Sequence, residues 1–205
     1  MNIHLYLHFM RIRDEKKEQK VRQKALELVV KHGLDGFSMQ KLAKAAGVSP
    51  ATIYIYYKDK EDLILQLGEE IGRHLTEATF EGFDMEMDLE TGLWVQWQNR
   101  SKYYLQHRLH IEFYEQLKQS PYRDRLAENI SSKFKAQMGG FMQNLLLKNE
   151  INPLSAEVFW SIAFAPLFNL IRFHLEGKSM GGKPYQISEK DIKEAFGLVI
   201  KALKK

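Results

Sequence analysis

The chain has 205 residues, of which 44% are hydrophobic and 27% are charged, as is usual for a globular protein with a buried core. It contains no cysteine, which excludes a disulfide framework and a thiolate metal site and favours a reducing, cytoplasmic compartment. The net charge is +4, but the segment 11–60 carries twelve basic and six acidic residues, which leaves −2 for the remainder. This asymmetry favours a polyanionic partner near the N-terminus.

The first fifteen residues are expected to form an N-terminal arm. The opening MNIHLYLHFM is apolar, but it lacks the basic start and the small-residue cleavage site of a signal peptide. Residues 1–15 are therefore expected to be either a flexible arm or an extension of the first helix. Translation is expected to start at Met1 or at Met10.

Residues 34–63 carry the signals of two short helices joined by a glycine turn. Ser38 is placed to cap the first of them, and Phe37 and Leu42 have the spacing of a hydrophobic staple. Gly47 follows at the point where a helix commonly ends on a left-handed residue, which costs glycine little. The pattern predicts a helix-turn-helix.

The second of these helices is predicted over residues 50–57. Ser49 is its cap. Pro50 is tolerated at the first helical position, because the N–H that proline lacks would have no hydrogen-bond partner there. At about 100° per residue, Pro50, Ile53 and Tyr57 fall on one side, which is expected to face the core. The other side presents small and β-branched groups flanked by two phenols, namely Ala51, Thr52 and Ile55 with Tyr54 and Tyr56.

An outer surface of this kind fits the major groove of DNA. Small and β-branched side chains can reach base edges, while the flanking phenols can bond the phosphates that border the groove. Lys58 and Lys60 then add positive charge, and Asp59 with Asp62 has the spacing of a capping box that opens the next helix. Any one of the outward residues could be an ordinary surface residue of a helical bundle, but their combination after a capped turn favours DNA binding.

The segment from Ala25 to Leu63, about a fifth of the chain, resembles the DNA-binding domain of the TetR (tetracycline repressor-like) family of bacterial regulators. The family pattern joins an apolar first helix, a small-residue second helix, a Gly-Val-Ser turn, a Thr-hydrophobic-Tyr recognition helix and a Lys-x-x-Leu exit. The matching residues here are Ala25, Leu28, Gly33, Ser38, Leu42, Ala43, Ala46, Gly47, Val48, Ser49, Thr52, Ile53, Tyr54, Lys60 and Leu63.

The resemblance implies an all-α fold with a three-helix DNA-binding domain over residues 16–62 and a helical effector-binding and dimerisation domain over residues 63–205. It implies that Ser38 is a phosphate-binding cap, that Thr52 and Tyr54 contact the groove and the backbone, that Tyr56 contacts the groove or a phosphate, and that Lys60 contacts a phosphate. With the cap Ser49 and the outward residues Ala51 and Ile55, these make up the predicted DNA-binding set.

Two positions depart from the family pattern. Ala51 stands where many members have glycine, and Tyr57 stands where they usually have phenylalanine. The methyl group of Ala51 alters the surface that faces the bases, so no operator sequence follows from the resemblance.

Beyond residue 60 the periodicity predicts helices over residues 59–80, 89–107, 109–119, 123–149 and 188–203. Gly139-Gly140 falls inside the fourth of these, where each glycine costs about 1 kcal/mol relative to alanine. The pair is therefore expected to mark a kink or the close approach of a ligand or another helix.

Residues 155–176 form a further helix with almost no polar face. Its apolar run of fourteen residues is shorter than the roughly 20 needed to cross a bilayer, so it is expected to be buried, one side in its own core and the other against a partner subunit. Pro166 is expected to kink it. By the resemblance, the last two helices form a dimer interface, predicted to include Phe159, Leu167, Leu170, Ile171, Phe196, Val199 and Ile200.

Aromatic residues make up 12% of the chain and gather on the middle helices, which permits a largely apolar effector pocket. The alternative is that they are plain core. The predicted pocket residues are Trp94, Trp97, Phe113, Phe134, Met138, Phe141, Met142, Phe164 and Phe168. No catalytic or metal-binding set is predicted and no cofactor is expected, because His107, His110 and Glu112 lie at a helix junction where polar residues are common.

The sequence thus predicts a homodimeric repressor that binds a pseudo-palindromic operator in double-stranded DNA and responds to an unidentified small molecule. The alternative is a helical small-molecule-binding protein or enzyme whose helix-turn-helix signal is incidental. RNA binding is disfavoured because RNA-binding modules usually present aromatic side chains on a sheet or loop.

Overall fold

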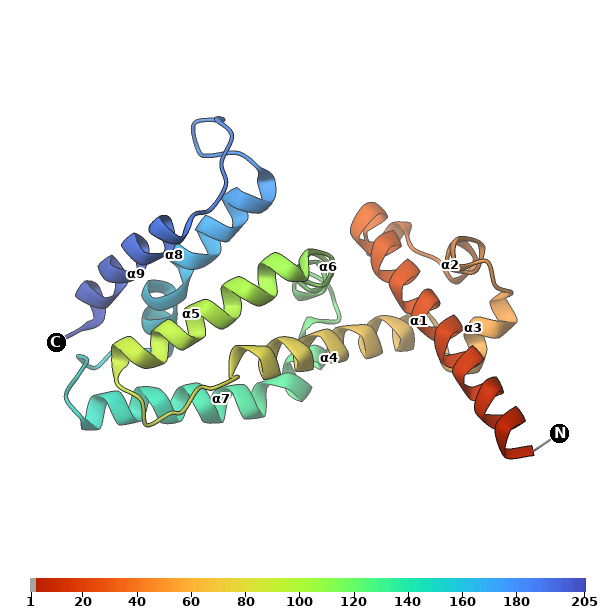
Figure 1. The fold of residues 1–205 in the computed structure, drawn as a ribbon, viewed down its shortest axis with the longest axis horizontal. Helices are drawn as coiled ribbons and strands as arrows, with labels where there is room; N and C mark the ends of the chain where they lie inside the picture. The colour runs from red at the N-terminus through yellow and green to blue at the C-terminus, as the bar shows by residue number, and fades with distance from the viewer. Residues whose placement is uncertain (1–2) are drawn as a thin grey trace. The chain divides into compact units, whose positions relative to one another are not determined.

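The computed structural model describes the backbone of residues 3–205 and the side chains of residues 15–126 and 132–205. Within residues 3–205 the chain forms α-helices and no β-strand, so the predicted all-α fold is confirmed (Figure 1). The helices are α1 (Ile3–Gly36), α2 (Met39–Ala46), α3 (Pro50–Tyr56), α4 (Lys60–Thr79), α5 (Leu89–Gln106), α6 (Arg108–Lys118), α7 (Arg123–Leu147), α8 (Ala156–Glu176) and α9 (Glu189–Leu203).

The chain divides into two compact units. Unit 1 contains Met1–Gly72 and Leu109–Asn129, and unit 2 contains Arg73–Arg108 and Ile130–Lys205. The chain therefore passes from one unit to the other within α4, after the first residue of α6, and within α7. A functional boundary after residue 62 stays a prediction, since the division by contacts lies ten residues later, at Gly72.

The N-terminal arm falls largely within α1, which begins at Ile3 and leaves helical geometry at Gly33, where φ is 72° and ψ is 170°. Met1 and Asn2 lie outside the described residues. Whether the arm is flexible in solution stays a prediction.

Unit 1 has a single apolar core in which α1, α2 and α3 pack together with parts of α4, α6 and α7. Leu42, Ile53 and Leu63 are fully buried in this core, and so is Phe113 of α6. A Cβ atom on Gly68 would lie 2.7 Å from side-chain atoms of Leu117 and Leu126, so α4 approaches α6 and α7 closely at this glycine.

Unit 2 is built around α5, which packs against α8 and α9. The indole of Trp97 is fully buried and donates a hydrogen bond of 2.8 Å to the carbonyl of Ala163. Its ring also contacts the ring of Phe196 edge-on, with centroids 5.3 Å apart. Figure 1 shows α8 and α9 side by side at the blue end of the chain.

The two neighbouring glycines of α7, Gly139 and Gly140, have different surroundings. A Cβ on Gly140 would lie 2.7 Å from the sulfur of Met85, whereas one on Gly139 would meet nothing within 4 Å. Met85 belongs to the turn between α4 and α5, whose backbone carbonyls also accept hydrogen bonds from Asn144 (3.0 Å) and Lys148 (2.7 Å). Gly140 is therefore closely approached, but by this turn and not by a neighbouring helix. The approach of a ligand stays a prediction.

Candidate DNA-binding surface

The helix-turn-helix has the caps and the turn that the sequence predicts. The hydroxyl of Ser38 accepts a hydrogen bond from the amide of Lys41 at 3.2 Å, and that of Ser49 accepts one from the amide of Thr52 at 3.2 Å. Between the two helices Gly47 has φ 68°, a left-handed conformation that favours glycine. These contacts fix where α2 ends and α3 begins, and hence which side of α3 faces outward.

The outward side of α3 matches the prediction at most positions. Ile53 is fully buried, whereas the side chains of Tyr54 and Ile55 are 53% and 76% exposed. Ala51 is also exposed, and Thr52 is half-buried. The structure thus brings the predicted base-facing residues together on one exposed surface.

Two details of α3 differ from the sequence prediction. Pro50 is exposed rather than buried, because it lies at the first turn, ahead of the part of the helix that reaches the core. Tyr57 lies just outside α3 as its C-cap, with extended backbone, yet its side chain is buried as expected. Tyr56 is half-buried and packs against the core of unit 1, so its ring offers less surface to DNA than that of Tyr54.

Hydroxyl groups on this surface are already engaged with one another. The hydroxyls of Ser49 and Thr52 lie 2.9 Å apart, within hydrogen-bonding distance. A hydroxyl can donate once and accept twice, so each retains capacity for a phosphate or a base edge. The arrangement orients Thr52 before any DNA is bound.

Lys60 does not extend into solvent as a free cation. Its ammonium donates a hydrogen bond of 2.7 Å to the carbonyl of Leu34 and lies 5.9 Å from the ring centroid of Phe37. An ammonium group has three protons, so a phosphate can still be bound by the remaining two. The lysine therefore ties the start of α4 to the end of α1, a structural role that the sequence prediction did not include.

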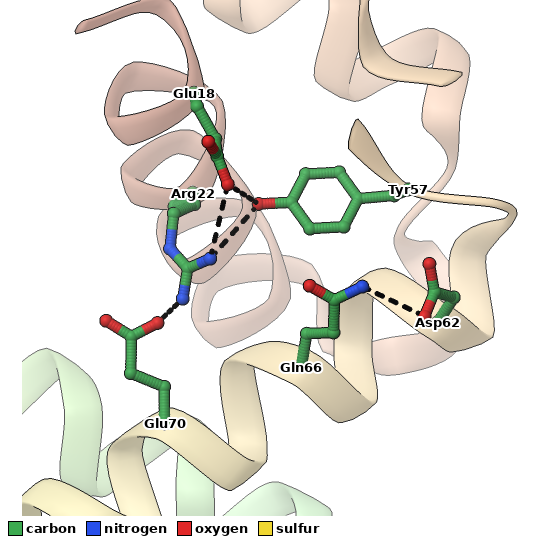
Figure 2. A network of polar contacts seen from close by, with 6 residues as sticks. All are labelled: Glu18, Arg22, Tyr57, Asp62, Gln66 and Glu70. Atoms are coloured by element: carbon green, nitrogen blue, oxygen red, sulfur yellow. Dashed lines mark hydrogen bonds and ion pairs between the residues drawn. The ribbon is translucent and has the colours of Figure 1, made fainter. Parts of the chain in front are cut away.

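A polar network links the end of the recognition helix to α1 and α4 (Figure 2). Arg22 forms an ion pair with Glu70 and donates a hydrogen bond of 3.3 Å to the hydroxyl of Tyr57. That hydroxyl in turn donates to Glu18 at 3.4 Å. Burial of the ring raises the pKa of Tyr57 to about 12, so the phenol stays protonated at neutral pH and can donate.

The start of α4 is held by a variant of the predicted capping box. Asp59 accepts a hydrogen bond of 2.8 Å from the amide of Asp62, as a cap should. The carboxylate of Asp62, however, accepts from the amide of Lys58 at 2.8 Å rather than from that of Asp59. Figure 2 shows its second contact, with Gln66. Hydrogen bonds from Gln66 and Lys58 hold the pKa of the Asp62 carboxyl below its usual value.

Tyr57→Phe should lower the free energy of unfolding by about 1 kcal/mol, because it removes one donor and one acceptor from a partly buried network. Urea unfolding of the full chain measures the change. Tyr54→Phe is the matched control, since its exposed hydroxyl forms no such network and its loss should change stability by less than about 0.5 kcal/mol. Equal unfolding midpoints for Tyr57→Phe and the unaltered protein would contradict the role assigned to the network.

The predicted pocket residues do not all lie together. Eight of the nine belong to the core of unit 2, but Phe113 is fully buried in the core of unit 1 and is therefore not part of the same set. The aromatic content of the middle helices suggests a pocket, but it does not indicate which core the helix of Phe113 joins. Trp97, Met138, Phe141 and Phe164 are buried, whereas Trp94, Phe134, Met142 and Phe168 are half-buried.

One buried charged residue of unit 2 is not among the residues predicted from the sequence. Arg100 is only 3% exposed and lies among the rings of Phe134, Trp160 and Phe164. Its spacing from Trp97, three positions earlier on the inner side of α5, is the signal that could have identified it. Within the described side chains, no group of three or more His, Asp or Glu residues is placed to hold a metal ion.

The predicted dimer residues lie mainly on the inner sides of α8 and α9. Six of the seven are buried within a single chain, namely Phe159, Leu167, Ile171, Phe196, Val199 and Ile200. Only Leu170 is half-buried. The hydrophobic residues that a partner could reach include Val158 and Leu198, which are 45% and 61% exposed. The structure therefore places six of the predicted interface residues in the core of a single chain. An interface formed by other sides of α8 and α9 stays a prediction.

Among the described residues, α8 is the one helix long and apolar enough to cross a membrane by length and composition, with a mean hydropathy of 1.4. Only 28% of that stretch is buried. Core helices of soluble proteins pass the same test, and α8 packs through Ala163 and Phe164 into the core of unit 2. The open remainder of its surface is what a contact with another subunit would cover.

Comparison with known proteins places this surface in a family. Residues 22–67 match the model described as "Bacterial regulatory proteins, tetR family". Over 46 residues the chain is 41% identical to the fatty acid metabolism regulator protein of Bacillus subtilis (strain 168), a match that covers 22% of this chain and 24% of that protein. The chain thus spans about a quarter of the length of the curated relatives it matches.

Solved structures extend the likeness beyond the helix-turn-helix. A TetR family transcription regulator from Marinobacter aquaeolei VT8 is 26% identical, with a TM-score of 0.76, over 95% of this chain and 99% of that one. A TetR family protein from Vibrio parahaemolyticus is 25% identical, with a TM-score of 0.73, over 92% and 99%. Residues 22–67 thus match the TetR family of bacterial regulatory proteins, and the chain shares the fold of TetR family regulators over nearly its whole length.

Proposed function

We propose that the protein is a cytoplasmic transcriptional repressor that binds operator DNA as a homodimer and changes its operator affinity when a small molecule binds. The observation that supports this best is the exposed outer side of α3, where Tyr54 and Ile55 project from a helix fixed at its start by Ser49. A short helix presented in this way fits the major groove.

The proposed DNA contacts divide into two kinds. Ala51, Thr52 and Ile55 are proposed to reach base edges and so to set sequence preference. Ser38, Ser49, Tyr54, Tyr56 and Lys60 are proposed to contact phosphates or the groove edge and so to set register and overall affinity. The excess of basic residues in segment 11–60 supports binding to a polyanion.

A dimer is proposed because one helix-turn-helix contacts only one half-site. Two-fold symmetry then predicts a pseudo-palindromic operator whose half-sites lie about one helical turn apart, or a multiple of it. We propose that the exposed sides of α8 and α9, including Val158, Leu170 and Leu198, form the interface. Val158 and Leu198 are exposed in the single chain, and Leu170 is half-buried.

The effector is proposed to bind in unit 2, where most of the predicted pocket residues lie. The relative from Bacillus subtilis regulates fatty acid metabolism by its name, but it matches this chain only in the DNA-binding segment. Its name therefore does not supply the effector. The alternative of a small-molecule-binding protein or enzyme with an incidental helix-turn-helix has less support, because the likeness to regulators of the family extends along the whole chain.

Thr52→Ala should change the DNA sequence that the protein prefers, whereas Tyr54→Phe should weaken binding to all sequences alike. Selection of genomic fragments by the purified protein, followed by titration of the enriched fragment at physiological salt, measures both. Lys135→Met, which changes an exposed cation on α7 in unit 2, is the control and should leave both properties unaltered. Failure of the unaltered protein to retain any fragment would contradict the proposed function.

A further inference from the structure

The core of unit 2 contains a guanidinium group. Arg100 projects from α5 and is only 3% exposed, which is unusual for a residue that is always charged at neutral pH. Its guanidinium carbon lies 4.6 Å from the ring centroid of Phe164, 5.0 Å from that of Trp160 and 5.9 Å from that of Phe134. Arginine is therefore enclosed by three aromatic rings contributed by α7 and α8.

The guanidinium has no carboxylate partner among the side chains of residues 15–126 and 132–205. Nη2 donates a hydrogen bond of 3.0 Å to Oε1 of Gln96, and Nε is buried with no hydrogen-bond acceptor. Gln96 is itself fully buried, and its side-chain amide donates a hydrogen bond of 3.1 Å to the carbonyl of Thr79. Arg100 is thus oriented by a neutral amide that leaves its positive charge uncompensated.

A buried cation without an anion is unfavourable, and the rings offset only part of this cost. Burial lowers the pKa of Arg100 to about 10, yet at neutral pH the group remains protonated. An anion beside it would restore the lost electrostatic stabilisation and supply the missing acceptor for Nε. Arginine binds carboxylates especially well, because two parallel N–H groups match the two carboxylate oxygens.

The surroundings of the guanidinium indicate what else such a ligand would carry. Phe134, Trp160 and Phe168 are half-buried, so the aromatic cluster around the Arg100 guanidinium is partly exposed to solvent. Trp160 lies 5.4 Å from Phe134 and 6.4 Å from Phe168, centroid to centroid, and the cluster continues to Phe80, 5.8 Å from Phe134. An apolar body fits this cluster better than a polar one.

We propose that Arg100 is the anion-binding residue of the effector site and that the effector is a monocarboxylate with an apolar body. This inference rests on the proposed function in placing the effector in unit 2, and it adds the chemical class of the molecule. Gln96 is a positioning residue in this site, because it holds Arg100 on one side and the last turn of α4 on the other through the carbonyl of Thr79.

The contact with Thr79 supplies a route from the site to α4. Thr79 is the last residue of α4, and its carbonyl also accepts a hydrogen bond of 3.0 Å from Asn99. α4 is continuous from Lys60, at the exit of the helix-turn-helix, to this point. A carboxylate that draws the guanidinium away from Gln96 would therefore change the hydrogen bonding at the end of the helix that leads to the DNA-binding segment.

The test compares each carboxylate with its own uncharged amide, without DNA. Decanoate and 4-phenylbutyrate are the probes, decanamide and 4-phenylbutyramide are their neutral counterparts, and tryptophan fluorescence with thermal unfolding reports binding. At least one carboxylate should bind the unaltered protein tenfold or more tightly than its amide, because a charge-assisted hydrogen bond is lost in the amide. The tighter ligand should also raise Tm more at equal concentration.

Two variants and one control assign the preference to Arg100. Arg100→Met removes the charge at similar length and should abolish the preference for the carboxylate while leaving the amide affinity within about threefold. Gln96→Glu keeps the side-chain shape but places a carboxylate of the protein beside Arg100. This variant should therefore bind the carboxylate probe at least tenfold more weakly than the unaltered protein does. Arg172→Met is the control, because Arg172 also lies over a ring, that of Phe173 at 4.8 Å, but is exposed and paired with Glu176.

The proposal is overturned if the unaltered protein binds no probe, if it binds carboxylate and amide equally, or if a folded Arg100→Met or Gln96→Glu variant keeps the preference. Should Arg100→Met fail to fold, the isosteric Gln96→Glu variant and the comparison in the unaltered protein decide. Operator binding is measured separately. A protein that binds its operator but shows no carboxylate preference refutes this inference alone, and one that binds the carboxylate but no DNA refutes the proposed function.

Discussion

Leu198→Glu is expected to separate the two subunits and to lower operator affinity by about 10²- to 10⁴-fold, because linking two half-site contacts in one molecule gives an advantage of this size. Leu198 is 61% exposed on α9, so the unaltered monomer leaves an apolar side chain open that a partner would cover. A glutamate would place a charge in that contact without disturbing the core of unit 2. Sedimentation at micromolar concentration and titration of operator DNA measure the two effects.

Leu147→Glu provides the control for this experiment. Leu147 is an 80% exposed leucine at the end of α7 in the same unit, and the substitution changes the charge equally. It should leave both the mass and the operator affinity unaltered. A Leu198→Glu variant that keeps the mass of a dimer would show that the interface lies elsewhere, and a monomeric unaltered protein would refute the proposed dimer.

The local structure of the helix-turn-helix was predictable because short-range chemistry decides it. Ser38, Gly47 and Ser49 act on backbone groups within three or four residues, so their effect does not depend on the rest of the fold. The same is true of the later caps, Ser155 and Ser188, which lie where the sequence placed the starts of their helices. Burial of Ile53 followed from helical periodicity alone.

Long-range partners were not predictable in the same way. Periodicity shows that one side of α9 is apolar, but both a core and a subunit interface require this, so Val199 was assigned to the interface although it is buried within the chain. A charge at Val199 would therefore unfold unit 2 rather than only separate subunits. Phe113 shows the same limit, because an apolar side on its helix does not indicate that the helix packs into the core of unit 1.

Residues whose role depends on an unexpected environment were missed for a related reason. Lysine and arginine are normally exposed. The sequence therefore predicts neither the hydrogen bond of Lys60 to the carbonyl of Leu34 nor the burial of Arg100. The partner of Lys60 is distant in sequence, and the rings around Arg100 come from two other helices. Such contacts follow from the packing of whole helices, which periodicity does not specify.

Trp97→Ala should have the largest effect on stability, lowering the free energy of unfolding of the chain by about 3–5 kcal/mol. The indole is fully buried, contacts Phe196 of α9 edge-on and donates to the carbonyl of Ala163 in α8. Its removal leaves a large cavity at the point where α5 meets both helices. Calorimetry and urea unfolding measure the loss.

The result decides whether Trp97 is core or pocket wall, the two alternatives that the sequence left open. A wall residue can be shortened with little loss of stability, because the space it leaves joins an existing cavity, whereas a core residue cannot. Trp94→Ala is the matched control: Trp94 is half-buried and contacts Phe196 at 4.8 Å, so it should cost only about 1–2 kcal/mol in proportion to the area it buries. If Trp97→Ala instead unfolds with the midpoint of Trp94→Ala or above it, Trp97 lines an open site, and the effector lies closer to α9 than the position of Arg100 implies.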